Sequence, residues 1–271
     1  MKYYYLIATL PDLTLEETKG KVDFGETIET IRRNLEKEDE KLFQFLLFPN
    51  DHRNLLNLIF SQYHQLALPP FESPSIFDKE TLEEYAHRPY EFPAHISDFL
   101  VTLQERFTTM SMAEMENQLL ERFYQHIAEL EDEFIRDYFA FERALKSIIV
   151  GLNRGLYTFM EGAETIEIDR ISERLAQEGV GATLLARTYP FIEKLGQVIA
   201  SKDPAQVEKT IDEIKWDYID GASNDFFGRQ QVFGYVLKLL MVKRWTALRE
   251  QEDGHLERLC QQIRISTVPV N

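Results

Sequence analysis

Two stretches of the chain follow the same helical plan, and this duplication constrains the fold more than any other feature. The first, SMAEMENQLLERFYQHI, covers residues 111–127, and the second, DPAQVEKTIDEIKWDYI, covers residues 203–219. Ser111 and Asp203 are both good N-cap residues, and each is followed three positions later by a Glu or Gln that can reach back to the cap. We therefore predict two amphipathic helices that are copies of one another.

Matching positions behind the two caps carry side chains of the same kind. Acidic residues correspond at Glu116 and Glu208, and aromatic residues correspond at Tyr124 and Trp216. Apolar residues share the register as well, in the pairs Met115 with Val207, Leu119 with Ile211 and Ile127 with Ile219. Each predicted helix is followed by a turn and then by a long helix that begins with aromatic residues. The repeated unit is thus a pair of helices.

A fainter third copy lies near the N-terminus. DHRNLLNLIF aligns with AFERALKSIIV so that Arg53 matches Arg143, and Arg244 in VKRWTAL takes the comparable place in the C-terminal copy. Only the first copy keeps an asparagine, Asn54, after its arginine. If Arg143 and Arg244 are equivalent, we expect each to be partly buried and paired with a carboxylate.

The copies predict an all-α protein made of three pseudo-repeated units of roughly 90–100 residues. A helix pair cannot bury its apolar stripe alone, so neighbouring copies pack together and share a core. Three units favour a compact, funnel-like single domain over residues 1–271 rather than an open stack. The repeats are expected at about 1–66, 93–155 and 182–263.

Helix-period segments recur along most of the chain, and convincing strand alternation is absent. A first helix is expected over 27–47, ended by Pro49, with Asn50 or Asp51 capping a second helix to about residue 66. Residues 67–93 form the one long proline-rich connection. A last break is expected at Gly254, before a final helix over 255–263.

Charge and cysteine content exclude several classes of function. Thirty basic against 46 acidic residues give a net charge of −16, which repels phosphate backbones and anionic lipids, so neither nucleic acid nor membrane is an expected partner. A basic protein partner is compatible with this charge. The single cysteine, Cys260, excludes an internal disulfide and fits a reducing compartment. We expect no signal peptide, no membrane insertion and a cytoplasmic location.

Residues 226–249 contain five cations and no acid. This segment is either a surface for an acidic partner or, the interpretation that we prefer, a core helix whose cations pair with neighbouring carboxylates.

No catalytic, cofactor-binding or metal-binding constellation is predicted, and no small-molecule substrate. Two Glu-x-x-His matches suit a carboxylate-metal enzyme in type, namely Glu84 with His87 and Glu252 with His255. Arg88-Pro89 follows the first, and Gly254 interrupts the second, so both lie at expected helix ends. The chain contains neither a phosphate-binding glycine loop nor a G-x-S-x-G nucleophile motif.

The three helical units, each closing on a long helix with an arginine and an apolar run, resemble the central-stalk subunit of V-type ATPases and ATP synthases, which occurs in prokaryotes and eukaryotes. RNLLNLI, RALKSII and RWTAL are similar to one helix of that family, and MENQLLERFYQHI and VEKTIDEIKWDYI to the helix before it. From MKYYYLIATLPDL to YVLKLLMVKRWTAL, the whole chain resembles still more closely a bacterial family of unknown function that is encoded within V-type ATPase operons.

This resemblance implies a mechanical role without bond chemistry. A stalk protein of that kind seats the rotating shaft and rests on the c-ring in the membrane, so it is cytoplasmic and reaches the inner membrane only through the complex. Its partners would be the shaft and the c-ring. A helical scaffold or assembly factor for the same complex remains an alternative, and a carboxylate-metal enzyme is a second one.

Overall fold

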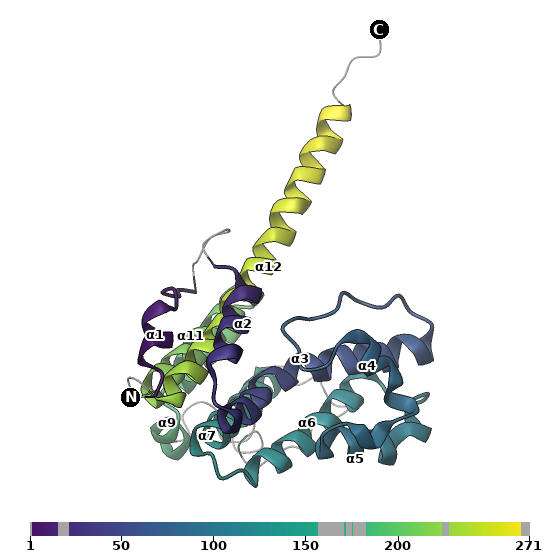
Figure 1. Cartoon of the computed structure of the whole chain (residues 1–271). Coiled ribbons are helices and arrows are strands. Elements are labelled where there is room, and N and C mark those ends of the chain that lie inside the picture. Colours follow the sequence, from purple (N-terminus) through teal and green to yellow (C-terminus); the bar gives the residue numbers. More distant parts are fainter. Residues whose placement is uncertain are drawn as a thin grey trace. The chain divides into compact units, whose positions relative to one another are not determined.

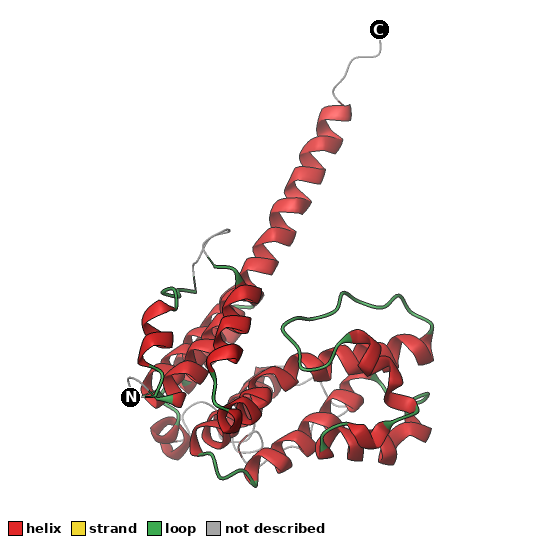
Figure 2. Cartoon of the chain, in the orientation of Figure 1, coloured by secondary structure: helices red, strands yellow, loops and turns green. Residues whose placement is uncertain are grey.

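A computed structural model describes residues 2–15, 22–156, 171, 175, 183–223 and 228–266; the side chains of 154–156, 183–184 and 250–266 are left out of the description. Within these residues every regular element is a helix, as Figure 2 shows. The prediction of an all-α fold is confirmed. In the same part of the chain, none of the helices is long and apolar enough to span a membrane.

The helices belong to two compact units, residues 1–36 with 219–271, and residues 37–218 (Figure 1). The first contains α1 (Tyr4–Thr9), α2 (Phe24–Asn34) and α12 (Arg229–Ser266). The second contains α3 (Lys37–His64), α4 (Lys79–Glu83), α5 (Ala94–Leu103), α6 (Met112–Ala128), α7 (Glu133–Leu156), α9 (Thr183–Thr188) and α10 (Ile192–Ala200), with the 3-10 helices η1 (Glu84–Ala86), η2 (Pro89–Glu91) and η3 (Gln104–Arg106). Helix α11 (Pro204–Ala222) begins in the second unit and ends in the first.

Helix α3 continues through Pro49, so the prediction that this proline ends the first helix is wrong. The break lies earlier, at Leu35, whose backbone is extended with φ −76° and ψ 145°. A proline inside a helix loses one hydrogen bond and costs about 3 kcal/mol. Buried residues on both sides, among them Phe48 and Leu55, hold the helix in the core and offset this cost.

The capped starts of the two similar helices agree with the structure, whereas the expected break near the C-terminus does not. Ser111 and Glu114 form a capping box at the start of α6, and the Asp203 carboxylate accepts the backbone N–H of Gln206 at the start of α11. Helix α12 runs without interruption past Gly254, so the predicted break there is wrong. A glycine costs a helix only about 1 kcal/mol relative to alanine, and good helix formers such as Glu252 and Leu256 lie close to this one. The sequence also predicts a helix over 169–177 and the start of the last long helix at residue 224; residues 224–227, and all of 169–177 except 171 and 175, lie outside the described residues.

Aromatic and aliphatic side chains form two apolar clusters in the unit of residues 37–218. One cluster joins α3, α4, α5 and the start of α6, with Phe99 and Phe107 fully buried. The other joins α7, α9, α10 and α11 around Leu145 and Leu195. The first cluster holds α3 and α4 in place and so positions the site described next.

In the unit of residues 1–36 and 219–271, the cations of the basic segment interact locally. The Lys238 ammonium forms an ion pair with Asp220 at the end of α11. The Arg249 guanidinium donates to the backbone carbonyl of Leu15 at 2.9 Å. These contacts support the interpretation of residues 226–249 as a helix whose cations pair with their surroundings.

Candidate protein-binding groove

The proline-rich segment between α3 and α4, residues 66–77, is fixed to α3 by side-chain hydrogen bonds. Asn54 is 4% exposed, and its amide both donates to the backbone carbonyl of Glu72 at 2.9 Å and accepts the Glu72 N–H at 2.7 Å. One turn earlier, Asn50 donates to the Pro74 carbonyl at 2.8 Å. These residues lie four apart and therefore share one face of the helix.

Asp51 completes this attachment from a buried position. Its carboxylate accepts the N–H groups of Ile76, at 3.0 Å, and Phe77, at 3.1 Å. The sequence predicted that Asn50 or Asp51 would cap a helix, but both side chains bind the segment instead. The segment forms neither a helix nor a strand, so its backbone N–H and carbonyl groups depend on such side chains for partners. Its prolines have no backbone N–H at all.

The environment of Asp51 also changes its acidity. Burial raises the pKa of the Asp51 carboxyl, the hydrogen bonds from Ile76 and Phe77 lower it, and the balance leaves the pKa at about 6. At pH 7 the group is therefore mostly ionised, and it accepts both N–H groups as a carboxylate. Charge-assisted hydrogen bonds of this kind are about twice as strong as neutral ones.

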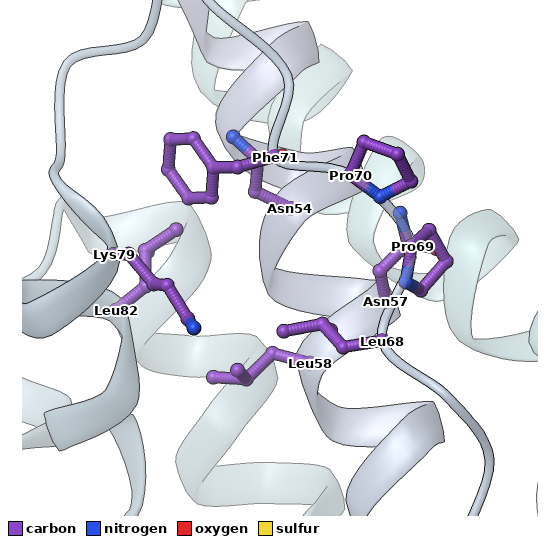
Figure 3. A pocket seen from close by; sticks show the side chains of 9 residues that line it. All are labelled: Asn54, Asn57, Leu58, Leu68, Pro69, Pro70, Phe71, Lys79 and Leu82. Atoms are coloured by element: carbon purple, nitrogen blue, oxygen red, sulfur yellow. The ribbon is translucent and has the colours of Figure 1, made fainter.

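Between the fixed segment, α3 and α4 lies a small opening of about 10 Å³ (Figure 3). An adjoining hollow of about 320 Å³, open to solvent, continues it past Leu58 and Leu68 towards Leu66 and Glu83, and we call the two together the α3–loop groove. The lining of the first part is mostly apolar and consists of Asn54, Asn57, Leu58, Leu68, Pro69, Pro70, Phe71, Lys79 and Leu82.

The segment exposes apolar side chains along this groove. Leu66 is 56% exposed, Leu68 is 40% exposed and Phe71 is 39% exposed. The charged side chains that line the groove, Lys79 and Glu83, pair with each other at 3.6 Å. The groove therefore offers apolar surface and no arrangement of acid, base and nucleophile, which suits binding of another protein.

Replacing Asp51 by alanine should loosen the segment, because it leaves two backbone N–H groups without their acceptor. We expect a loss of about 1–2 kcal/mol in the free energy of unfolding and faster amide hydrogen exchange at Ile76 and Phe77. Asn57→Ala is the matched control, since the structure describes no bond from Asn57 to the segment. Equal exchange at Ile76 and Phe77 in both variants would contradict this account.

The structure places the predicted site residues in different surroundings. Asn54 lines the groove, while Arg53 beside it is exposed and forms an ion pair with Glu72 at 3.5 Å. Arg143 has a 44% exposed side chain, bonds to Glu121 at 2.9 Å and lies 5.7 Å from the ring centre of Tyr124. Structure and sequence thus agree on a carboxylate partner for Arg143.

Arg244, like Arg143, is exposed, and its guanidinium lies 5.8 Å from the centre of the neighbouring Trp245 ring. The expected partial burial is therefore found at neither arginine.

The paired positions of α6 and α11 agree only in part. Tyr124 is buried, Trp216 is half-buried, and Glu116 and Glu208 are both exposed. The buried side chains of α11, those of Thr210, Asp212, Ile214 and Ile219, correspond to Gln118, Leu120, Arg122 and Ile127, of which only Ile127 is buried in α6.

A nearly buried ion pair joins α7 to α11. The Lys215 ammonium lies 2.8 Å from the Glu142 carboxylate, and their side chains are 20% and 15% exposed. Burial raises the pKa of Glu142, but Lys215 and Lys146 outweigh it and hold the pKa at about 2. Tyr138 lies close by, and burial followed by the nearby Glu142 charge raises the pKa of its phenol. No sequence pattern indicates this pair, because its partners are 73 positions apart.

Three histidines that look scattered in the sequence meet between α3, α5 and α6. Nε2 of His52 lies 2.9 Å from Nε2 of His95, and both residues are 3% exposed. The ring of His126 stacks on His95 at 5.6 Å, and Phe123 lies edge-on to His52. Each histidine falls three or four positions from a phenylalanine on the apolar face of its helix, which is the signal that could have revealed this cluster.

The buried pair of histidines, His52 and His95, is neutral in the folded protein. Burial, followed by the neighbouring His95 and Lys146, lowers the pKa of His52 well below its usual value. Burial and the neighbouring His126 lower the pKa of His95 to about 3. One ring therefore donates to the other in the His52–His95 bond.

The structure describes the side chains of the first Glu-x-x-His candidate for a metal site, Glu84 with His87, but not those of the second. Glu84 lies in the 3-10 helix η1, and its carboxylate is 3.9 Å from Arg88. The side chains of Glu252 and His255 lie outside the described residues. Within the described part of the chain, no group of three or more His, Cys, Asp or Glu side chains is placed to hold a metal ion.

The fold and the groove place this chain in the class of all-α proteins, with amphipathic helices and an apolar groove on the surface. Over residues 1–265 the chain matches the sequence model of a family described as protein of unknown function (DUF2764), and it belongs to that family. A search of curated proteins and a search of solved structures each found no match.

Proposed function

We propose that this chain is a non-catalytic connector of a V-type ATPase or ATP synthase, which couples the rotating shaft to the membrane c-ring. The proposal comes from the resemblance to central-stalk proteins of that complex. The observation that carries it is the correspondence of α6 and α11. Both helices begin at a side-chain cap, and the last apolar position of the shared register, Ile127 in α6 and Ile219 in α11, is buried in both.

A second correspondence supports duplication of the helix pair. In each pair, a cation on the long second helix bonds to a carboxylate on the first. Arg143 of α7 bonds to Glu121 of α6, and Lys238 of α12 bonds to Asp220 of α11.

A connector between the shaft and the c-ring has to be a stiff body, and it carries out no bond chemistry. A shaft can transmit torque through this protein only if its helices do not shift against each other. Close-packed interiors have low compressibility and transmit strain, and the fully buried aromatic residues Phe99, Phe123 and Phe139 supply such packing here.

An assembly factor for the same complex is the second candidate. The observation in its favour is the division of the chain into two compact units, whose boundaries fall inside the predicted repeats 1–66 and 182–263. A factor of this kind would bind the ATPase while it is being built and would be missing from the finished enzyme.

Purification of the ATPase through a tag on its catalytic headpiece separates these roles. For a connector, we expect the chain in the finished complex in fixed proportion to the shaft. Its deletion should leave ATP hydrolysis by the headpiece in place and lower ATP-driven ion transport at least tenfold. For an assembly factor, the finished complex lacks the chain but deletion lowers its yield. Absence from every ATPase fraction, with normal transport after deletion, would refute both.

A further inference from the structure

We infer that the α3–loop groove binds a segment of a partner protein that presents an apolar side chain flanked by lysine or arginine. This inference goes beyond the proposed function, because it concerns the chemistry of one groove and holds for any partner protein.

The first argument is that the proline-rich segment, residues 66–77, forms one wall of the groove and is rigid. Three side chains of α3, those of Asn50, Asp51 and Asn54, hold five backbone groups of the proline-rich segment. Prolines restrict the backbone of the same segment further. Phe71, next to the bound Glu72, is therefore held in place before any partner arrives, and Pro69 and Pro70 restrict the backbone that follows Leu68. Preorganisation of this kind lowers the entropy cost of binding.

The second argument is the exposed apolar surface that this wall carries. Exposed apolar groups that gather in one place mark interaction sites more often than isolated ones do. Here Leu66, Leu68 and Phe71 are each more than a third exposed. The hollow of about 320 Å³ beside Leu58, Leu66 and Leu68 has room for an anchoring side chain, whereas the opening of about 10 Å³ next to Leu82 holds no more than a water molecule.

The third argument is charge, and it identifies the occupant. Between residues 66 and 83 the chain has four carboxylates, those of Glu72, Asp78, Glu80 and Glu83, and a single lysine. Lys79 pairs with Glu83, and Arg53 of α3 pairs with Glu72, so Asp78 and Glu80 account for the remaining negative charge. The chain as a whole carries −16. A second copy would bring like charge to this rim, whereas a segment with lysine or arginine beside its apolar anchor complements it.

The test selects peptides from a displayed library of random 12-residue sequences against the full-length protein. We expect binders that share an apolar residue with lysine or arginine close to it. Their affinity should fall at least tenfold for Leu68→Asp and for Phe71→Asp. Because the new carboxylate adds attraction for a basic peptide, a loss of affinity reports the apolar contact.

Two matched controls place the same carboxylate elsewhere in the same unit. Tyr90 and Val101 are 79% and 46% exposed, so Tyr90→Asp and Val101→Asp should leave peptide affinity unchanged. Circular dichroism melting of all four variants checks that they fold. The inference is overturned by failure to select any binder, by binders without basic residues, or by affinity that survives both groove substitutions. A concentration-dependent dimer that Phe71→Asp abolishes would assign the groove to a second copy instead.

Discussion

Replacing Lys215 by methionine should lower the free energy of unfolding by about 2–3 kcal/mol. The substitution keeps most of the apolar stem but leaves the Glu142 carboxylate without its cation in a largely buried place. Breaking a buried pair costs about 3–5 kcal/mol, and the remaining exposure of the two side chains, 20% and 15%, reduces this figure. Urea unfolding at pH 7 measures the difference.

The ion pair of Lys194 and Glu213 provides the control. Its ammonium and carboxylate are 2.9 Å apart, but the side chains are 59% and 35% exposed. Lys194→Met should therefore cost less than about 1 kcal/mol. The double variant Glu142→Leu with Lys215→Met should recover most of the stability, since neither member of the bonded pair is left buried without the other. Equal losses for Lys215→Met and Lys194→Met would show that burial does not matter here.

Acidification from pH 7 to pH 5 should destabilise the protein through its buried histidines. A histidine with a pKa of 6.5 when unfolded and about 3 when folded binds its proton first in the unfolded state. Its stabilising effect is complete above pH 6.5 and is lost as the pH falls towards 3. For His95 alone, the loss between pH 6.5 and 5 is about 2 kcal/mol, and His52 acts in the same direction.

Asp51 opposes this effect, because its pKa of about 6 lies above the unfolded value of 3.8 and the folded protein gains a proton first. A comparison with the double variant His52→Leu with His95→Leu isolates the histidine contribution. Between pH 7 and pH 5, the free energy of unfolding of this variant should fall less than that of the wild-type protein, by about 2 kcal/mol or more. His87→Gln, at an exposed position, is the control. Parallel pH profiles for all three proteins would exclude the histidine pair as the cause.

Local patterns in the sequence predicted the helices well where capping and periodicity agreed. Ser111 and Asp203 mark helix starts because their side chains act on N–H groups two or three residues away. Pro49 and Gly254 misled the prediction for one shared reason. Each is a local helix breaker, and a buried or strongly helical surrounding outweighs a local cost of a few kcal/mol.

The sequence predicted only some of the residues that form the groove. Asn54 and the proline-rich connection were both singled out, but nothing in the pattern says that Asn54 binds Glu72. The same holds for His52 and His95, which are 43 positions apart and meet only because α3 and α5 pack together. Side-chain contacts between helices depend on packing angles, which apolar periodicity does not specify.

The α3–loop groove is assembled from a single continuous stretch of chain, because every residue that lines it lies between Asn54 and Glu83. Its contact order is therefore low, and little loop-closure entropy opposes its formation. The apolar cluster that holds α3 and α4 ends at Leu119, so the groove can re-form after a local opening without the rest of the chain. A partner would thus meet a complete docking surface once the residues up to about 119 have folded, even during synthesis of the remaining polypeptide.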